Sequence, residues 1–351
     1  MKLHVGEKQM LSRAGMGLAA AMTILVSHGA GAQNFFADKQ MTILVGSGVG
    51  GGYDIYARMV GRHWPKHIPG APTFVVQNLP AAGSLVAMNT IANSAPKDGT
   101  HIGAVQNHIG VEPIMGITGA PENARYDSRK LHWIGSAAKE VAVVVAWHNS
   151  GFKSFKDLQD RVMLVGSPGV ATSSSVYANL LNELAGTKFK VITGYNTPAA
   201  IDLALERNEI QGRTGWYVSS MLSGKKHWLD EGKIEVLLQL AMEKHEALPK
   251  VPLVTEFIGD PVKRAQLEFA FSWQLMGRPF VVPAEVPADR VKLLRESFMR
   301  MLADPDVKTE AAKLGLEISP MTGEEVQALI ARIYDTPPET VQRIRSIVVP
   351  K

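Results

Sequence analysis

The sequence predicts an α/β fold with two lobes, each built on a mostly parallel β-sheet flanked by helices. Short apolar segments alternate with amphipathic segments along most of the chain, which is typical of strands joined by helices. Val141–Trp147 is apolar throughout, as expected for a strand that is covered on both faces. The length of 351 residues favours two lobes. No linker rich in proline, glycine or serine separates them, so we expect the chain to cross between the lobes.

The same alternation predicts the individual elements in order. Strands are expected at Thr42–Val45, Thr73–Gln77, His101–Gln106, Val141–Trp147, Val162–Val165, Lys190–Thr193, Ile210–Thr214 and Ile234–Ala241. Helices are expected from about Tyr53 onward, and at Ser84–Asn93, Ser173–Ala185 and Pro198–Arg207. After Pro283 the pattern becomes mostly helical, with helices expected at Ala288–Leu302, Pro305–Leu314, Gly323–Tyr334 and Glu339–Ile347.

Residues 1–32 have the pattern of an export signal. Lys2, Lys8 and Arg13 form a basic segment, Ala14–Val26 is an apolar run, and Ala30-Gly31-Ala32 supplies the small residues of a cleavage site. The apolar run is shorter than the roughly 20 residues that a membrane span needs. We therefore expect cleavage after Ala32 and a mature protein in the periplasm.

The composition argues against several functional classes. The chain has no cysteine, which removes disulfides, thiolate metal sites, thiol catalysis and a lipid-modified N-terminal cysteine. The formal net charge of +4 at pH 7 is too small for a nucleic-acid surface, although it is compatible with a small acidic ligand. No metal-binding motif stands out, so we expect neither a metal site nor a bound cofactor.

Met41–Arg58 is the most informative segment, because it combines a strand, a glycine-rich turn and the start of a helix. Free N–H groups at such a turn and helix start form an anion site. Gly46–Gly51 also has the G-x-G-x-x-G spacing of a dinucleotide site. The acidic residue that such a site needs is missing, since the next strand ends in Gln77-Asn78. Capture of a small carboxylate is therefore favoured, and an exported NAD-linked enzyme is the alternative.

Two segments in the second half of the chain have a similar order. Val165–Ser175 reads as a strand, a turn of small residues and a helix start rich in hydroxyl groups. Gly194–Pro198 supplies a third loop, with proline in a position that suits the first turn of a helix. Simple N-capping would explain each serine or threonine alone. Donor-rich turns in both halves favour one ligand shared between the two lobes.

Seven motifs, taken in order, resemble the periplasmic solute-binding proteins of tripartite tricarboxylate transporters, the Bordetella-uptake type. They are Val49–Arg58, Asn78–Ser84, Ala95–Thr100, Gly166–Gly169, Tyr195–Arg207, Leu248–Pro252, and Pro283–Pro287 followed by Ala303–Val307. The chain departs from the family pattern at Val49, which stands in place of a proline. It departs again at Ala81 and Ser84, which stand in place of glycines.

The resemblance implies a periplasmic clamshell with the ligand between its lobes. Gln33–Gly135 and Lys250–Lys351 would form the first lobe, and Ser136–Pro249 the second. It also implies a monomeric, non-enzymatic protein that binds a di- or tricarboxylate or an aromatic carboxylate. Such a protein delivers its ligand to the permease subunits of a membrane transporter. A periplasmic sensor that presents its closed form to a membrane receptor is the second alternative.

In the family, backbone N–H groups and ordered waters of two turns hold one carboxylate of the ligand. By this resemblance the predicted ligand-binding residues are Gly51, Gly52, Tyr53 and Asp54 from the first lobe, and Ser167, Thr172, Ser173, Ser174 and Tyr195 from the second. Ser84, Gln106 and Asn107 follow strand ends and are expected near the distal end of the ligand. Asp54 is expected to brace its turn rather than touch an anion. Trp216 and Tyr217 are expected to form either an aromatic wall or part of the core.

Overall fold

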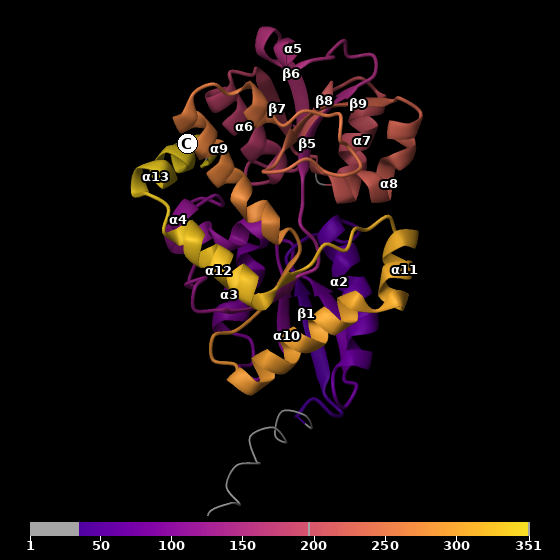
Figure 1. Ribbon diagram of the computed structural model, residues 1–351, viewed down its shortest axis with the longest axis vertical. Helices are drawn as coiled ribbons and strands as arrows, with labels where there is room; N and C mark the ends of the chain where they lie inside the picture. The colour runs from indigo at the N-terminus through magenta and orange to yellow at the C-terminus, as the bar shows by residue number, and fades with distance from the viewer. Residues whose placement is uncertain (1–34, 196, 350–351) are drawn as a thin grey trace, which may run out of the picture.

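The computed structural model describes residues 35–195 and 197–349, so the predicted export signal lies outside the described residues. The chain forms two α/β lobes, which lie one above the other in Figure 1 and each contain one sheet. The predicted two-lobed α/β fold is confirmed. In the described part of the chain, no helix is both long enough and apolar enough to span a membrane.

The sheet of the first lobe has six strands in the order β11-β4-β10-β3-β1-β2. Their bounds are β1 Gln40–Val45, β2 Thr73–Asn78, β3 His101–Ala104, β4 His132–Ser136, β10 Pro279–Val282 and β11 Met321–Thr322. β1 pairs in parallel with β2 and β3, whereas β10 and β11 pair antiparallel with their neighbours. This sheet therefore has the expected parallel strands at one end and antiparallel strands at the other.

The sheet of the second lobe has five strands in the order β7-β6-β8-β5-β9. Their bounds are β5 Ala142–Trp147, β6 Met163–Ser167, β7 Phe189–Thr193, β8 Gly212–Tyr217 and β9 Ile234–Leu240. β6 pairs in parallel with β7 and β8, and β5 pairs antiparallel with β8 and β9. β8 begins two residues later than the expected Ile210–Thr214 and continues through Trp216 and Tyr217.

Helices flank the two sheets and connect their strands. The α-helices are α2 Gly52–His63, α3 Leu85–Asn93, α4 Glu112–Met115, α5 Phe155–Asp160, α6 Ser173–Ala185, α7 Pro198–Glu206, α8 Val218–Asp230, α9 Pro261–Ser272, α10 Ala288–Ala303, α11 Pro305–Lys313, α12 Gly323–Tyr334 and α13 Pro338–Val348. Short 3₁₀ helices are η1 Trp64–His67, η2 Ala82–Ser84, η3 Asn107–Gly110, η4 Pro121–Asn123, η5 Val254–Phe257 and η6 Trp273–Met276. α13 contacts both α4 and α6, so the C-terminal helix touches elements of both lobes. The lobe boundaries given above stay a prediction.

Each sheet contains three parallel strands that are consecutive in sequence, and the first of the three lies between the other two. β1 lies between β2 and β3, and β6 lies between β7 and β8. In this strand order the connecting helices leave on opposite faces, and ligands bind beyond the carboxyl end of the central strand. The turn after β1 and the turn after β6 are the two donor-rich segments that the sequence singled out.

Two segments that run between the sheets lie side by side. Residues 137–141 lead from β4 to β5, and residues 274–278 lead into β10. Their backbones are joined by hydrogen bonds from Ala137 N to Arg278 O (3.0 Å), from Glu140 N to Gln274 O (2.9 Å) and from Arg278 N to Ala138 O (3.2 Å). The chain thus crosses between the lobes through paired segments, as expected from the missing linker.

Candidate functional site

The glycine-rich turn after β1 brings the first turn of α2 towards the second lobe. Gly51 is the N-cap of α2 and offers no side-chain acceptor to the N–H groups of the first turn. Asp54 braces this turn, because its Oδ2 accepts hydrogen bonds from Gly50 N (2.9 Å) and Arg58 Nε (3.0 Å). Burial acts to raise the pKa of Asp54, but these bonds and that from Asn78 outweigh it and lower the pKa overall. The Asp54 carboxylate is therefore bonded inside the first lobe.

Asn78 occupies the end of β2, where a dinucleotide site carries an acidic residue. Its Nδ2 donates to Ser47 O (2.9 Å) and to Asp54 Oδ1 (2.8 Å), and its Oδ1 accepts from Arg58 Nη2 (2.8 Å). The amide thus holds the glycine turn in place and provides no carboxylate for a ribose. This arrangement weakens the dinucleotide alternative.

Two tyrosine hydroxyls from different lobes are joined through Asn107, one by its backbone and the other by its side chain. Asn107 N donates to the Tyr53 hydroxyl (3.1 Å), and Asn107 Nδ2 donates to the Tyr217 hydroxyl (3.1 Å). Tyr53 belongs to α2, Asn107 begins η3 after β3, and Tyr217 ends β8. Tyr217 therefore lies at the contact between the lobes. Trp216 is instead buried in the core of the second lobe, with the Arg213 guanidinium 3.9 Å from its ring centre.

Arg278 and Glu140 form a buried ion pair beside these tyrosines, and the sequence predicted neither residue. Arg278 Nη2 lies 2.8 Å from Glu140 Oε1 and donates to Ser219 Oγ (2.9 Å). The guanidinium carbon lies 4.3 Å from the centre of the Tyr53 ring. Burial alone would lower the pKa of Arg278, but the Glu140 carboxylate outweighs burial and raises it. Arg278 therefore carries a permanent positive charge at the contact between the lobes.

Gly52 is the point where α2 comes closest to these groups. A Cβ atom at Gly52 would lie 2.7 Å from Ser220 Oγ and 2.9 Å from Arg278 Nη2. At Gly51 a Cβ atom would meet only Gly48 O, at an ordinary 3.5 Å. Ser220 belongs to the first turn of α8, which also begins without a side-chain cap. The N-termini of α2 and α8 therefore face each other, with Arg278 beside them. We call this meeting point the interlobe contact.

The hydroxyl groups after β6 surround one carbonyl oxygen. Ser167 Oγ, Thr172 Oγ1 and Ser175 Oγ each bond to Gly169 O, at distances between 2.8 and 2.9 Å. Thr172 is the N-cap of α6, yet its hydroxyl does not cap the helix, so the first N–H groups of α6 lack a side-chain acceptor. These hydroxyls shape the turn, and its backbone N–H groups are the donors that it can offer to a ligand.

The start of α6 is attached to the end of β8. Ser173 Oγ donates to Gly215 O (2.9 Å), and Ser174 O accepts from Thr214 Oγ1 (2.6 Å). α6 therefore begins next to the strand that leads into α8. Tyr195, from the third predicted loop, is partly buried against the core of the second lobe.

Ser84 joins two loops of the first lobe. Its hydroxyl donates to Gly46 O (2.7 Å) and accepts from Gln106 N (3.0 Å), which links the turn after β1 to the end of β3. Its φ of 79° lies in the left-handed region that favours glycine, and these two bonds hold the serine there. Ser84 and the Gln106 backbone thus position the loop that carries Asn107.

His108, next to Asn107 in η3, predicts a pH dependence of stability. Burial lowers the pKa of His108 to about 4, from an ordinary 6.5. Between these values the unfolded chain binds a proton that the folded chain excludes, so the free energy of unfolding falls as the pH falls through this window. The loss should reach about 3 kcal/mol at pH 4. Urea unfolding of the wild type and of His108→Gln across this range measures it. A difference between the two proteins that does not change with pH would contradict the assignment.

Two α/β lobes that are joined by paired crossing segments, with helix N-termini meeting between them, define the class of two-lobed periplasmic binding proteins. The periplasmic binding protein BugD has this fold, with a TM-score of 0.69 and 17% sequence identity over 90% of this chain and 100% of that chain. The R. palustris protein Rpa4515, solved with adipate, matches with a TM-score of 0.68 and 15% identity over 89% of this chain and 99% of that chain.

The chain belongs to the tripartite tricarboxylate transporter family of receptors, whose family model matches residues 57–345. A UPF0065 protein of Bordetella bronchiseptica is 21% identical over 321 residues, which span 89% of this chain and 88% of that protein. The family that the seven motifs predicted is thus confirmed. It is a family of solute-binding receptors.

Proposed function

We propose that this chain binds a small organic carboxylate between its lobes and delivers it to the permease subunits of a tripartite tricarboxylate-type transporter. The observation that carries this proposal is the position of three helix N-termini. α2 and α8 begin at the interlobe contact, and α6 begins beside the end of β8. None of the three has a side-chain cap. Val218 N, the first N–H of α8, donates to Val141 O (2.9 Å), so the groups available to an anion are the first-turn N–H groups of α2 and α6 and those that follow Val218 in α8.

Electrostatics at the interlobe contact favours a negatively charged ligand. The three helix N-termini each carry a partial positive charge. The full charge of Arg278 is balanced by the adjacent Glu140 carboxylate, so the helix N-termini supply the net positive potential. One helix terminus contributes about 0.3–2 kcal/mol to a bound anion, whereas micromolar affinity requires about 8 kcal/mol. Direct hydrogen bonds and the exclusion of water when the lobes close must supply the remainder. A ligand that contacts both lobes then shifts the population towards the closed form.

The comparisons support this choice of ligand and of partner. The family description names a transporter receptor, and the structure of Rpa4515 was solved with adipate. Export through the predicted signal would place the protein in the periplasm, where such a receptor meets its permease. We propose that the ligand contacts Gly51, Gly52 and Tyr53 in the first lobe. In the second lobe it contacts the turn and helix start that contain Ser167, Thr172, Ser173 and Ser174. Asn107 and Tyr217 would lie at the distal end.

A thermal-shift panel on the purified chain tests the proposal. The panel contains malate, adipate, citrate, benzoate and NAD⁺, and calorimetric titration gives the dissociation constant of each hit. We expect stabilisation by one or a few of the carboxylates, of about 2.7 kcal/mol at a ligand concentration of 100 times the dissociation constant. Stabilisation by NAD⁺ alone would instead support the dinucleotide alternative.

Delivery to a permease, rather than signalling to a receptor, needs a separate measurement. Uptake of the identified carboxylate into proteoliposomes that contain the permease subunits should require the loaded protein. If the loaded form stimulates no uptake and co-purifies with a membrane receptor instead, the sensor alternative holds.

A further inference from the structure

A second contact between the lobes involves residues 315–319, which lie between α11 and β11. Leu316 and Ile318 pack into the core of the first lobe. The Glu317 carbonyl oxygen accepts a hydrogen bond from the hydroxyl of Tyr56 (2.7 Å), which belongs to α2. The first lobe therefore holds this segment, which we call the strap.

The backbone of the strap lies directly against α8 of the second lobe. A Cβ atom at Gly315 would lie 2.7 Å from Ser223 Cα and 3.2 Å from Ser223 N, which is too close for a side chain. Gly315 also has a φ of 65°, in the left-handed region that glycine adopts without strain. The glycine thus allows the strap to approach the second lobe closely.

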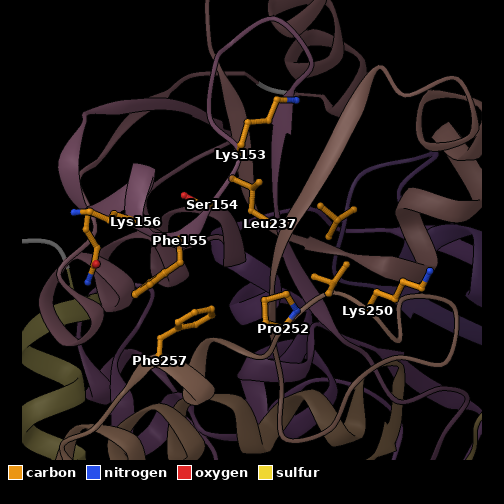
Figure 2. A pocket seen from close by; sticks show the side chains of 11 residues that line it. Lys153, Ser154, Phe155, Lys156, Leu237, Lys250, Pro252 and Phe257 are labelled. Atoms are coloured by element: carbon orange, nitrogen blue, oxygen red, sulfur yellow. The ribbon is translucent and has the colours of Figure 1, made fainter.

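The Glu317 side chain contacts a histidine of the second lobe. Glu317 Oε2 lies 2.7 Å from His245 Nε2. His245 is in the loop after β9, and its backbone N–H donates to Gln239 Oε1 (2.7 Å). The loop then returns along the strand, where the carbonyl oxygen of Pro252, beside β9 in Figure 2, accepts from Gln239 N (2.9 Å). The second lobe therefore holds His245, and its contact with Glu317 joins the lobes.

The surroundings of His245 favour its protonated form. The hydrogen bond with Glu317 raises the pKa of His245 and outweighs burial, which lowers this pKa. Glu140 in the crossing segment and Glu246 in the same loop also raise it, and these three carboxylates are the charged groups with the largest effect on His245. The same contact lowers the pKa of Glu317. Both shifts have the direction expected for an ion pair between a carboxylate and a protonated imidazole.

Neither member of this pair belongs to the crossing segments, which are residues 137–141 and 274–278. His245 is anchored in one lobe and Glu317 in the other, so a rotation of the lobes about the crossing segments changes the distance between the two side chains. By linkage, an arrangement in which Glu317 is close binds the proton of His245 more tightly than one in which it is distant. Protonation of His245 and approach of the lobes therefore favour each other.

We propose that His245 and Glu317 form a pH-dependent latch, which favours the closed arrangement of the lobes when His245 is protonated. The contribution of the latch is complete below about pH 6.5, the ordinary pKa of histidine, and is lost as the pH rises through the raised pKa. Its consequence for the ligand rests on the function proposed above. A carboxylate that needs the closed form should bind more tightly at the lower pH.

Fluorescence energy transfer between the lobes tests the latch without any ligand. The chain has no cysteine, so two introduced cysteines can carry the dyes. Glu122→Cys in η4 and Lys156→Cys in α5 place them on exposed residues of different lobes. We expect the ratio of closed to open protein to be at least about threefold higher at about pH 6 than at about pH 8.5, and Glu317→Gln to remove most of this difference. The same ratio at both pH values, or an unchanged response in Glu317→Gln, would overturn the latch.

His67→Gln is the matched control for this experiment. His67 Nε2 lies 2.9 Å from Asp304 Oδ2, so it forms the same kind of pair. Both residues belong to the first lobe, in η1 and at the start of α11, and their distance does not depend on how the lobes are arranged. His67→Gln should therefore keep the pH response of the wild type. A loss of the response in this variant equal to that in Glu317→Gln would assign it to general destabilisation and refute the latch.

Calorimetric titration with malate, adipate, citrate and benzoate at the same two pH values separates the latch from the proposed function. Comparing the proteins at one pH cancels the protonation of the ligand itself. We expect the gain in affinity from about pH 8.5 to about pH 6 to be at least about threefold larger in the wild type than in Glu317→Gln. If a carboxylate binds with the same pH dependence in both proteins, the latch is refuted and the proposed function stands. If none binds while the energy transfer responds as expected, the latch stands and the proposed function fails.

Discussion

Replacing Gly52 with valine should abolish carboxylate binding while both lobes stay folded. A Cβ atom at this position would already lie 2.7 Å from Ser220 Oγ and 2.9 Å from Arg278 Nη2, and the two methyl groups of valine extend further. The side chain would hold α2 away from α8, so a ligand could no longer contact both helix N-termini. We expect the dissociation constant to rise at least about 100-fold, equivalent to about 2.7 kcal/mol, in calorimetric titration with the best ligand of the panel.

Gly48→Val is the matched control for this prediction. Gly48 lies in the same turn, and a Cβ atom there would meet nothing within 4 Å. This variant should bind the ligand within about threefold of the wild type. Small-angle scattering should show compaction on ligand addition for Gly48→Val and none for Gly52→Val. Wild-type affinity in Gly52→Val would exclude the N-terminus of α2 from the ligand site.

The parallel part of each sheet could be predicted because its strands follow one another in sequence. β1, β2 and β3, like β6, β7 and β8, are apolar segments separated by helical ones, and this local pattern is visible without any long-range contact. β10 could not be found in this way. Its four residues lie between Arg278 and Pro283, which is too short for a periodic pattern. Its partners β3 and β4 come from much earlier in the chain, and their pairing is set by the tertiary fold.

The candidate site could be predicted to the extent that it consists of local motifs. The glycine turn before Gly52 and the hydroxyl-rich turn before Ser173 each form an uncapped helix start from contiguous residues. Single charged residues carry no such signal, and Arg278 and Glu140 resemble surface residues in sequence. The close approach at Gly52 rather than Gly51 depends on how the second lobe lies against α2, which no local pattern encodes.

Glu140→Leu is expected to be strongly destabilising, because it leaves the Arg278 guanidinium buried without its partner. Glu140 and Arg278 are both almost completely inaccessible, with side chains 1% exposed. Removing one partner of a buried ion pair lowers the free energy of unfolding by about 3–5 kcal/mol, whereas replacing both with apolar residues is often nearly neutral. In urea unfolding, the double variant Glu140→Leu/Arg278→Met should therefore be more stable than Glu140→Leu alone.

The pH dependence of the two single variants should differ, and this difference separates a charge effect from lost packing. Burial raises the pKa of Glu140 and Arg278 opposes that rise, so Arg278→Met lets the pKa climb further above its ordinary 4.5. The carboxyl group can then take up a proton, and the destabilisation of Arg278→Met should be small near pH 4.5 and grow as the pH rises through the raised pKa. In Glu140→Leu the remaining Arg278 cannot lose its proton in this range, so this variant's own free energy of unfolding should show no pH dependence from this pair. If the free energies of unfolding of the two single variants change with pH in the same way, and the double variant loses the sum of their losses, the two side chains act independently and no buried ion pair joins the crossing segments.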